Sequence, residues 1–84
     1  MLKRKIGETV YVGNEFEIGT IIDTKENNKN FDNSYDYLVK FERPLVFYSI
    51  GVLNQKYYTE KELDEILNKR EIANMIQKTL REGF

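Results

Sequence analysis

The chain has 84 residues, a formal net charge of −1, and neither cysteine nor histidine. Its length allows one domain with a small hydrophobic core, and its composition excludes disulfides, thiolate sites and histidine-based catalysis or metal binding. A charge this close to neutral is also atypical of a dedicated nucleic-acid-binding domain.

The first two predicted strands are framed and interrupted by glycine. The segment "ETVYV", residues 8–12, is β-branched and aromatic, and turn signals stand on either side at Gly7 and at Gly13–Asn14. Gly19 interrupts the next strand, "FEIGTIIDTK". Such a glycine usually marks a bulge or a close backbone approach, and we predict a bend that lets this strand curl rather than a merely tolerated glycine. Alternation in that strand predicts one shared face for Phe16, Ile18, Thr20 and Ile22.

A polar loop over Glu26–Ser34 precedes two further apolar segments. Pro44 is predicted to end the first of them, "YDYLVKFE", because proline cannot donate to a strand ladder. The second, "LVFYSIGVL" at residues 45–53, is apolar on both faces, so it is either a covered central strand or carries an exposed patch. Alternation in the first segment places Tyr35, Tyr37, Val39 and Phe41 on one face.

Helical spacing begins at Thr59, which forms a capping box with Glu62. Two apolar stripes follow, and they point to nearly opposite sides of any continuous helix. A second capping signal, Asn68 with Glu71, coincides with the change of side. We therefore favour two helices broken near Asn68 over one helix that contacts two surfaces. The stripes are Leu63, Ile66 and Leu67, then Ile72, Ile76 and Leu80.

Few residues could support catalysis. Ser34 and Ser49 have no histidine to act as their base. Asp23, Asp32 and Asp36 could contact a hard cation, but they match no metal-binding motif, and we favour solvated loop carboxylates. The sequence therefore predicts a protein that is not an enzyme and that holds no cofactor and no metal.

Six tyrosines and five phenylalanines are more aromatic residues than a core of this size needs. Some of them are expected to be exposed, where they could anchor a protein interface or stack on bases, although buried rings with solvated hydroxyls are an equal alternative. The candidate partner-binding residues are Tyr11, Tyr35, Tyr48, Tyr58, Ile72, Met75, Ile76 and Leu80. The nucleic-acid alternative would use Lys25, Lys29, Lys69 and Arg70, for which a solvated face is the commoner explanation.

Short motifs follow one another along residues 6–63: glycine-acid-x-valine-x-valine, glycine-x-isoleucine, Y-x-V-x-F and Y-x-x-x-E-L. They fall at Gly7, Glu8, Val10 and Val12; Gly19, Thr20 and Ile21; Tyr37, Val39 and Phe41; and Tyr58, Glu62 and Leu63. This order resembles small SH3-like barrels, including KOW-type ones. The resemblance implies one mainly β (α+β) domain over 1–84, with a five-stranded barrel in 6–58 and one or two helices in 59–84.

Proteins that resemble this pattern are frequent among accessory proteins of bacteriophages and mobile elements. We therefore expect a cytoplasmic, non-enzymatic protein-binding module that inhibits or redirects a host protein, for example as an anti-CRISPR-like inhibitor of a defence nuclease. KOW-type barrels bind RNA or ribosomal partners, often through basic residues around the first turn, where this chain has Glu15 and Glu17. A nucleic-acid-binding barrel, a structural or virion-assembly protein, and a homodimer remain alternatives, and no membrane partner is expected.

Overall fold

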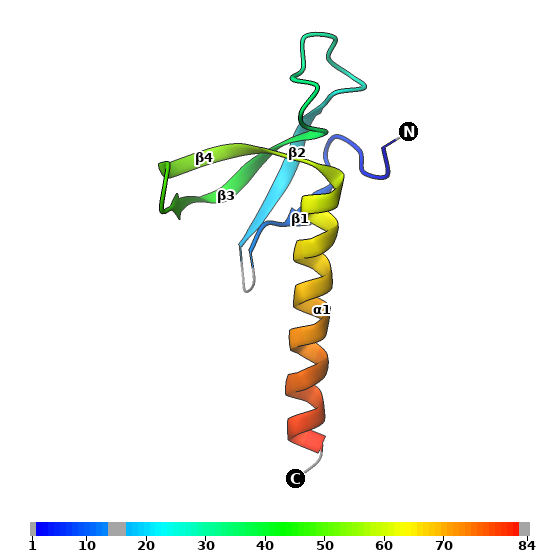
Figure 1. Cartoon of the computed structure of the whole chain (residues 1–84), viewed down its shortest axis with the longest axis vertical. Helices are drawn as coiled ribbons and strands as arrows, with labels where there is room; N and C mark the ends of the chain where they lie inside the picture. Colours follow the sequence, from blue (N-terminus) through cyan, green and yellow to red (C-terminus); the bar gives the residue numbers. More distant parts are fainter. Residues whose placement is uncertain (1, 14–16, 83–84) are drawn as a thin grey trace.

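Four antiparallel strands and one helix make up the described part of this computed structural model: the backbone of residues 2–13 and 17–82, with side chains up to Ile72. The strands pair in chain order, so β1 and β4 are the two edges of one open sheet (Figure 1). The elements are β1 (Thr9–Tyr11), β2 (Ile18–Thr24), β3 (Tyr37–Phe47), β4 (Gly51–Tyr58) and α1 (Glu60–Glu82). A mainly β chain with a C-terminal helical segment is confirmed, but the fifth strand of the expected barrel is not found within these ranges.

The hydrophobic core lies between one face of the sheet and the start of α1. Tyr37, Val39 and Phe41 of β3 all point into it, as the alternation predicts, and each is at most 5% exposed. The helix contributes Leu63, which is 2% exposed. The side chains that pack together in this core cluster are Val10, Val12, Ile21, Tyr37, Val39, Phe41, Tyr58 and Leu63.

The predicted core face of β2 is wrong. Gly19 and Ile21 face inward, whereas Thr20 and Ile22 are exposed, and Phe16 lies outside the described residues. Because glycine has no side chain, a count of apolar residues favours the other alternate set. The error therefore comes from Gly19, which lies on the buried face but adds no apolar side chain to the pattern.

Gly19 marks a close approach between β2 and β3 rather than the bend that the sequence favoured. A Cβ atom at this position would lie 2.6 Å from Val39 Cγ1 and 2.8 Å from the Lys40 carbonyl oxygen. The irregularity of β2 lies further along, where its register with β3 shifts between Ile21 and Asp23. Glycine is therefore required at position 19 because only hydrogen fits against the neighbouring strand.

β3 does not end at Pro44, contrary to the prediction, but continues to Phe47. Its register with β4 shifts between Lys40 and Leu45, so Pro44 lies in an irregular stretch rather than in a regular ladder. A proline is tolerated at a bulge because no ladder hydrogen bond is needed from it there. The proline thus marks a bend within one long strand.

A single continuous helix replaces the predicted break at Asn68. Its start is the predicted capping box: the Glu62 backbone N–H donates to Thr59 Oγ1 (3.1 Å), and the Thr59 N–H donates to Glu62 Oε1 (3.0 Å). Leu63 is buried against the sheet, while Ile72 is 58% exposed. The second capping signal lies within regular helix, and α1 extends well beyond the sheet (Figure 1).

A network that the sequence did not reveal ties the N-terminal residues to the sheet and the helix. The Tyr37 hydroxyl donates to Glu60 Oε1 (2.9 Å) and accepts from the Arg4 backbone N–H (3.1 Å). The Lys3 N–H also donates to Glu60 Oε1 (2.8 Å), and Arg4 Nη2 pairs with Asp64 Oδ1 (2.8 Å). We refer to these five residues as the N-terminal latch, because they hold the first turn of α1 against the core.

Candidate functional site

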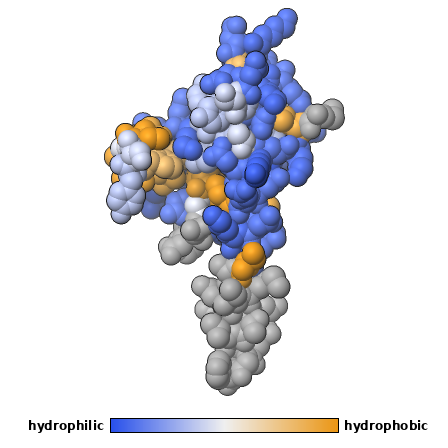
Figure 2. Space-filling view, viewed as in Figure 1, coloured by the Kyte–Doolittle hydropathy of each residue, from blue (hydrophilic) through white to orange (hydrophobic). Residues whose placement is uncertain are grey.

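The most unusual surface of the molecule is the distal end of the β3–β4 hairpin, residues 45–53, which we call the hairpin tip. These nine residues contain no charged side chain, although charged residues make up 32% of the chain. Figure 2 shows apolar side chains gathered on this end of the hairpin, which extends away from α1. The most exposed apolar side chains are Val46 (78%), Tyr48 (109%), Ile50 (62%) and Val52 (66%).

The turn at the hairpin tip has a defined conformation. The Ile50 N–H donates to the Phe47 carbonyl (3.1 Å), and Phe47 pairs with Gly51 across the turn. Gly51 has a φ of 102°, in the left-handed region that favours glycine. A three-residue loop closed by such a glycine is a common hairpin connection, so the tip presents Tyr48 and Ile50 in a preset arrangement.

One face of the hairpin tip is attached to the core. Leu45, Phe47 and Leu53 are half-buried and pack against the core side chains. The rings of Phe41 and Phe47 lie with centroids 5.9 Å apart, although the irregular stretch of β3 separates them. This inward packing leaves Val46 and Val52, which are register partners, on the opposite and exposed face.

Lys56 carries the charge nearest to the hairpin tip on β4, and it contacts aromatic rings and a helix carboxylate rather than the tip. Lys56 Nζ lies 4.4 Å from the ring centroid of Tyr58 and 5.6 Å from that of Phe47. It also lies 4.0 Å from Glu62 Oε2 on α1. Because its ammonium group is drawn over these rings, Lys56 closes the core beneath the hairpin rather than adding charge to the tip.

The exposed apolar side chains of the hairpin tip together offer on the order of 500 Å², a size typical of functional surface patches. A protruding aromatic flanked by aliphatic side chains is suited to insertion into an apolar groove of a partner. The alternative left open for residues 45–53 is therefore settled in favour of an exposed patch.

The predicted tyrosine contacts are separated by the fold. Tyr48 is fully exposed on the hairpin tip. Tyr58, in contrast, is only 3% exposed and belongs to the core, where burial raises its pKa to about 12, so this residue does not line an exposed surface. Tyr35 is half-buried against the ring of Tyr57 (5.7 Å). Tyr11 is 42% exposed, although the Arg70 guanidinium of α1 lies over its ring.

The helical candidates are described only in part. Ile72 is exposed, on the far side of α1 from the buried Leu63, which agrees with the opposed stripes. Met75, Ile76 and Leu80 lie outside the described side chains. Of the helical candidates only Ile72 is therefore placed, and it lies on α1, away from the hairpin tip.

The four basic residues of the nucleic-acid alternative do not converge. Lys25 Nζ pairs with Asp36 Oδ1 (2.7 Å), which raises the pKa of Lys25 and lowers that of Asp36. The guanidinium of Arg70 lies 3.8 Å from the ring centroid of Tyr11, which joins α1 to β1. Lys25 and Lys29 belong to the β2–β3 loop, whereas Lys69 and Arg70 belong to α1, which extends away from that loop (Figure 1). No single described surface collects these charges.

The loop carboxylates act as structural acceptors. Asp23 accepts from Asn27 Nδ2 and Asn28 Nδ2 at 3.0 Å, and these hydrogen bonds lower the pKa of Asp23. Asp36 accepts from the Glu60 backbone N–H at the start of α1 (2.7 Å). Within residues 2–13 and 17–72, no three carboxylates gather as metal ligands. Asp23 and Asp36 are thus hydrogen-bond acceptors within the fold rather than the solvated carboxylates that the sequence favoured.

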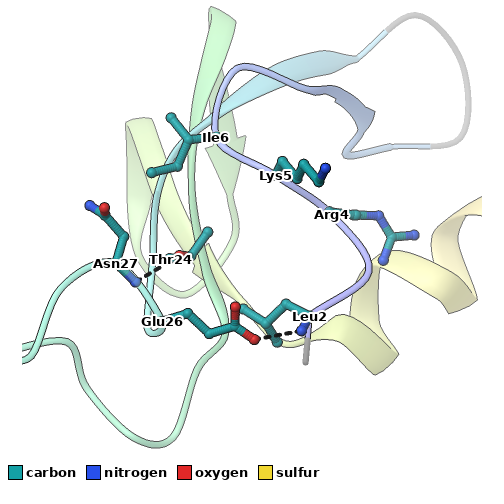
Figure 3. Close-up of a pocket in the computed structure, with 7 residues that line it drawn as sticks. All are labelled: Leu2, Arg4, Lys5, Ile6, Thr24, Glu26 and Asn27. Carbon is teal, nitrogen blue, oxygen red and sulfur yellow. Dashed lines mark hydrogen bonds between the residues drawn. The ribbon is translucent and has the colours of Figure 1, made fainter.

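An open cavity of about 590 Å³ lies beside the N-terminal latch (Figure 3). Two hydrogen bonds join residues of its lining: the Leu2 N–H donates to Glu26 Oε1 (2.6 Å), and the Asn27 N–H donates to Thr24 Oγ1 (3.1 Å). The Arg4 guanidinium points away from the cavity toward α1, where Asp64 holds it.

Searches of protein-family models, curated proteins and solved structures found no match to this chain. None of the described helical sequence is long and apolar enough to cross a membrane.

Proposed function

We propose that this chain is a non-enzymatic protein-binding module whose recognition surface is the hairpin tip. The observation that carries the proposal is the exposure of Val46, Tyr48, Ile50 and Val52 in a stretch without charge. Exposed apolar side chains cost solubility, so a patch of this size usually has a partner that covers it.

The geometry of the hairpin tip supports this function in a second way. Gly51 and the Phe47–Ile50 hydrogen bond fix the turn before any partner arrives. A fixed turn reduces the conformational entropy that is lost when Tyr48 is ordered in a complex. The partner surface that fits this tip is an uncharged groove wide enough for one aromatic ring.

The biological setting rests on the resemblance of the sequence to SH3-like accessory proteins. In this setting the partner is a protein of the host of a phage or mobile element, such as a defence nuclease, and the chain blocks or redirects it. The same surface would serve a virion-assembly protein, whose partner would instead be encoded by the same mobile element.

The function can be tested by quantitative pull-down from host cells with three chains. They are the wild type, a Tyr48→Ser/Ile50→Ser variant, and an Ile22→Ser control, which alters an exposed apolar residue of β2. A partner retained by the wild type and the control but lost by the double variant is the expected result. A partner retained equally by all three folded chains would show that the tip is not the recognition surface.

A further inference from the structure

We draw no further inference here: the strongest candidate, the free edge of β4 beside the hairpin tip, carries no proposal, because the inward–outward alternation of this strand breaks at Asn54 and nothing in the structure shows what covers it.

Discussion

The two halves of the β3–β4 hairpin share the same strands but have opposite environments. Val39 in the proximal half is completely buried, whereas Val46 in the distal half is 78% exposed. Both are valines of one strand, so hydrophobicity does not explain the difference. The face of the strand does: Val39 shares the inward face with Leu45 and Phe47, whereas Val46 lies on the outward face, which carries Lys40 and Glu42 in the proximal half.

The largest effect expected from this comparison is on stability. Val39→Ala should lower the free energy of unfolding by about 2–3 kcal/mol, because it opens a cavity among fully packed side chains. Val46→Ala, the same change in the exposed half, should stay within about 0.5 kcal/mol. Urea unfolding of both variants measures the difference, and similar losses would contradict the assignment of the two halves.

Gly19→Ala tests the close approach of β2 to the proximal half. The added methyl group would meet the side chain of Val39 and the backbone of Lys40, so we expect a loss of about 1–3 kcal/mol. Gly51→Ala is the comparison in the distal half: it meets no atom within 4 Å and should cost only the strain of a positive φ, about 1 kcal/mol. The reverse order in thermal melts would refute this account.

Acid should weaken the attachment of the proximal half to α1. Hydrogen bonds from the Lys3 backbone N–H to Glu60 and from Arg4 to Asp64 lower the pKa of both carboxyl groups below their ordinary values of 4.5 and 3.8. Their contribution to stability is thus present above those values and is lost as the pH falls through the lowered ones.

The residue to replace is Asp64. Asp64→Asn should be less stable than the wild type at neutral pH, and its stability should fall less between about pH 5 and pH 3. Glu42→Gln, at an exposed position of β3 outside the latch, should follow the wild-type curve. Chemical unfolding at a series of pH values measures all three chains, and parallel curves for Asp64→Asn and the wild type would argue against the latch.

The smallest expected effect is at Lys56, where the two halves meet. Lys56→Gln removes the cation from above the Tyr58 ring and should cost about 0.5–1 kcal/mol. Lys40→Gln, on the exposed side of β3, should be nearly neutral. Equal effects in urea titrations would mean that the ring contact contributes nothing measurable.

The sequence predicted the features that depend on local chemistry. Thr59 with Glu62 correctly started the helix, and the alternation of Tyr37, Val39 and Phe41 correctly identified a buried face. The same local rules failed at Asn68, because a capping signal is also compatible with the interior of a helix that is already growing. They failed at Pro44 because the irregular register there requires no hydrogen-bond donor at position 44, so a proline can stand within the strand.

For the hairpin tip, the sequence predicted only two alternatives, a covered central strand or an exposed patch. An uncharged run over residues 45–53 was visible in the sequence, but its exposure depends on whether another element covers the outward face of the hairpin, which is a tertiary property. Tyr58 and Tyr48 could not be ranked, because one lies on the core side of β4 and the other on a turn that the sequence analysis placed within a strand. The latch escaped notice because its partners are far apart in the chain.

That distance gives the latch a place in the order of folding. All strand pairs of the sheet join neighbours in the chain, and such local pairs form early because little loop entropy opposes them. The bonds from Lys3 to Glu60 and Asp64 span 57 and 61 residues, so they can close only after the whole meander and the first helical turn exist. The N-terminal latch is then the last part of the molecule to form and the first to open. Hydrogen–deuterium exchange of the Lys3 and Arg4 amides should therefore be faster than that of the Val39 amide.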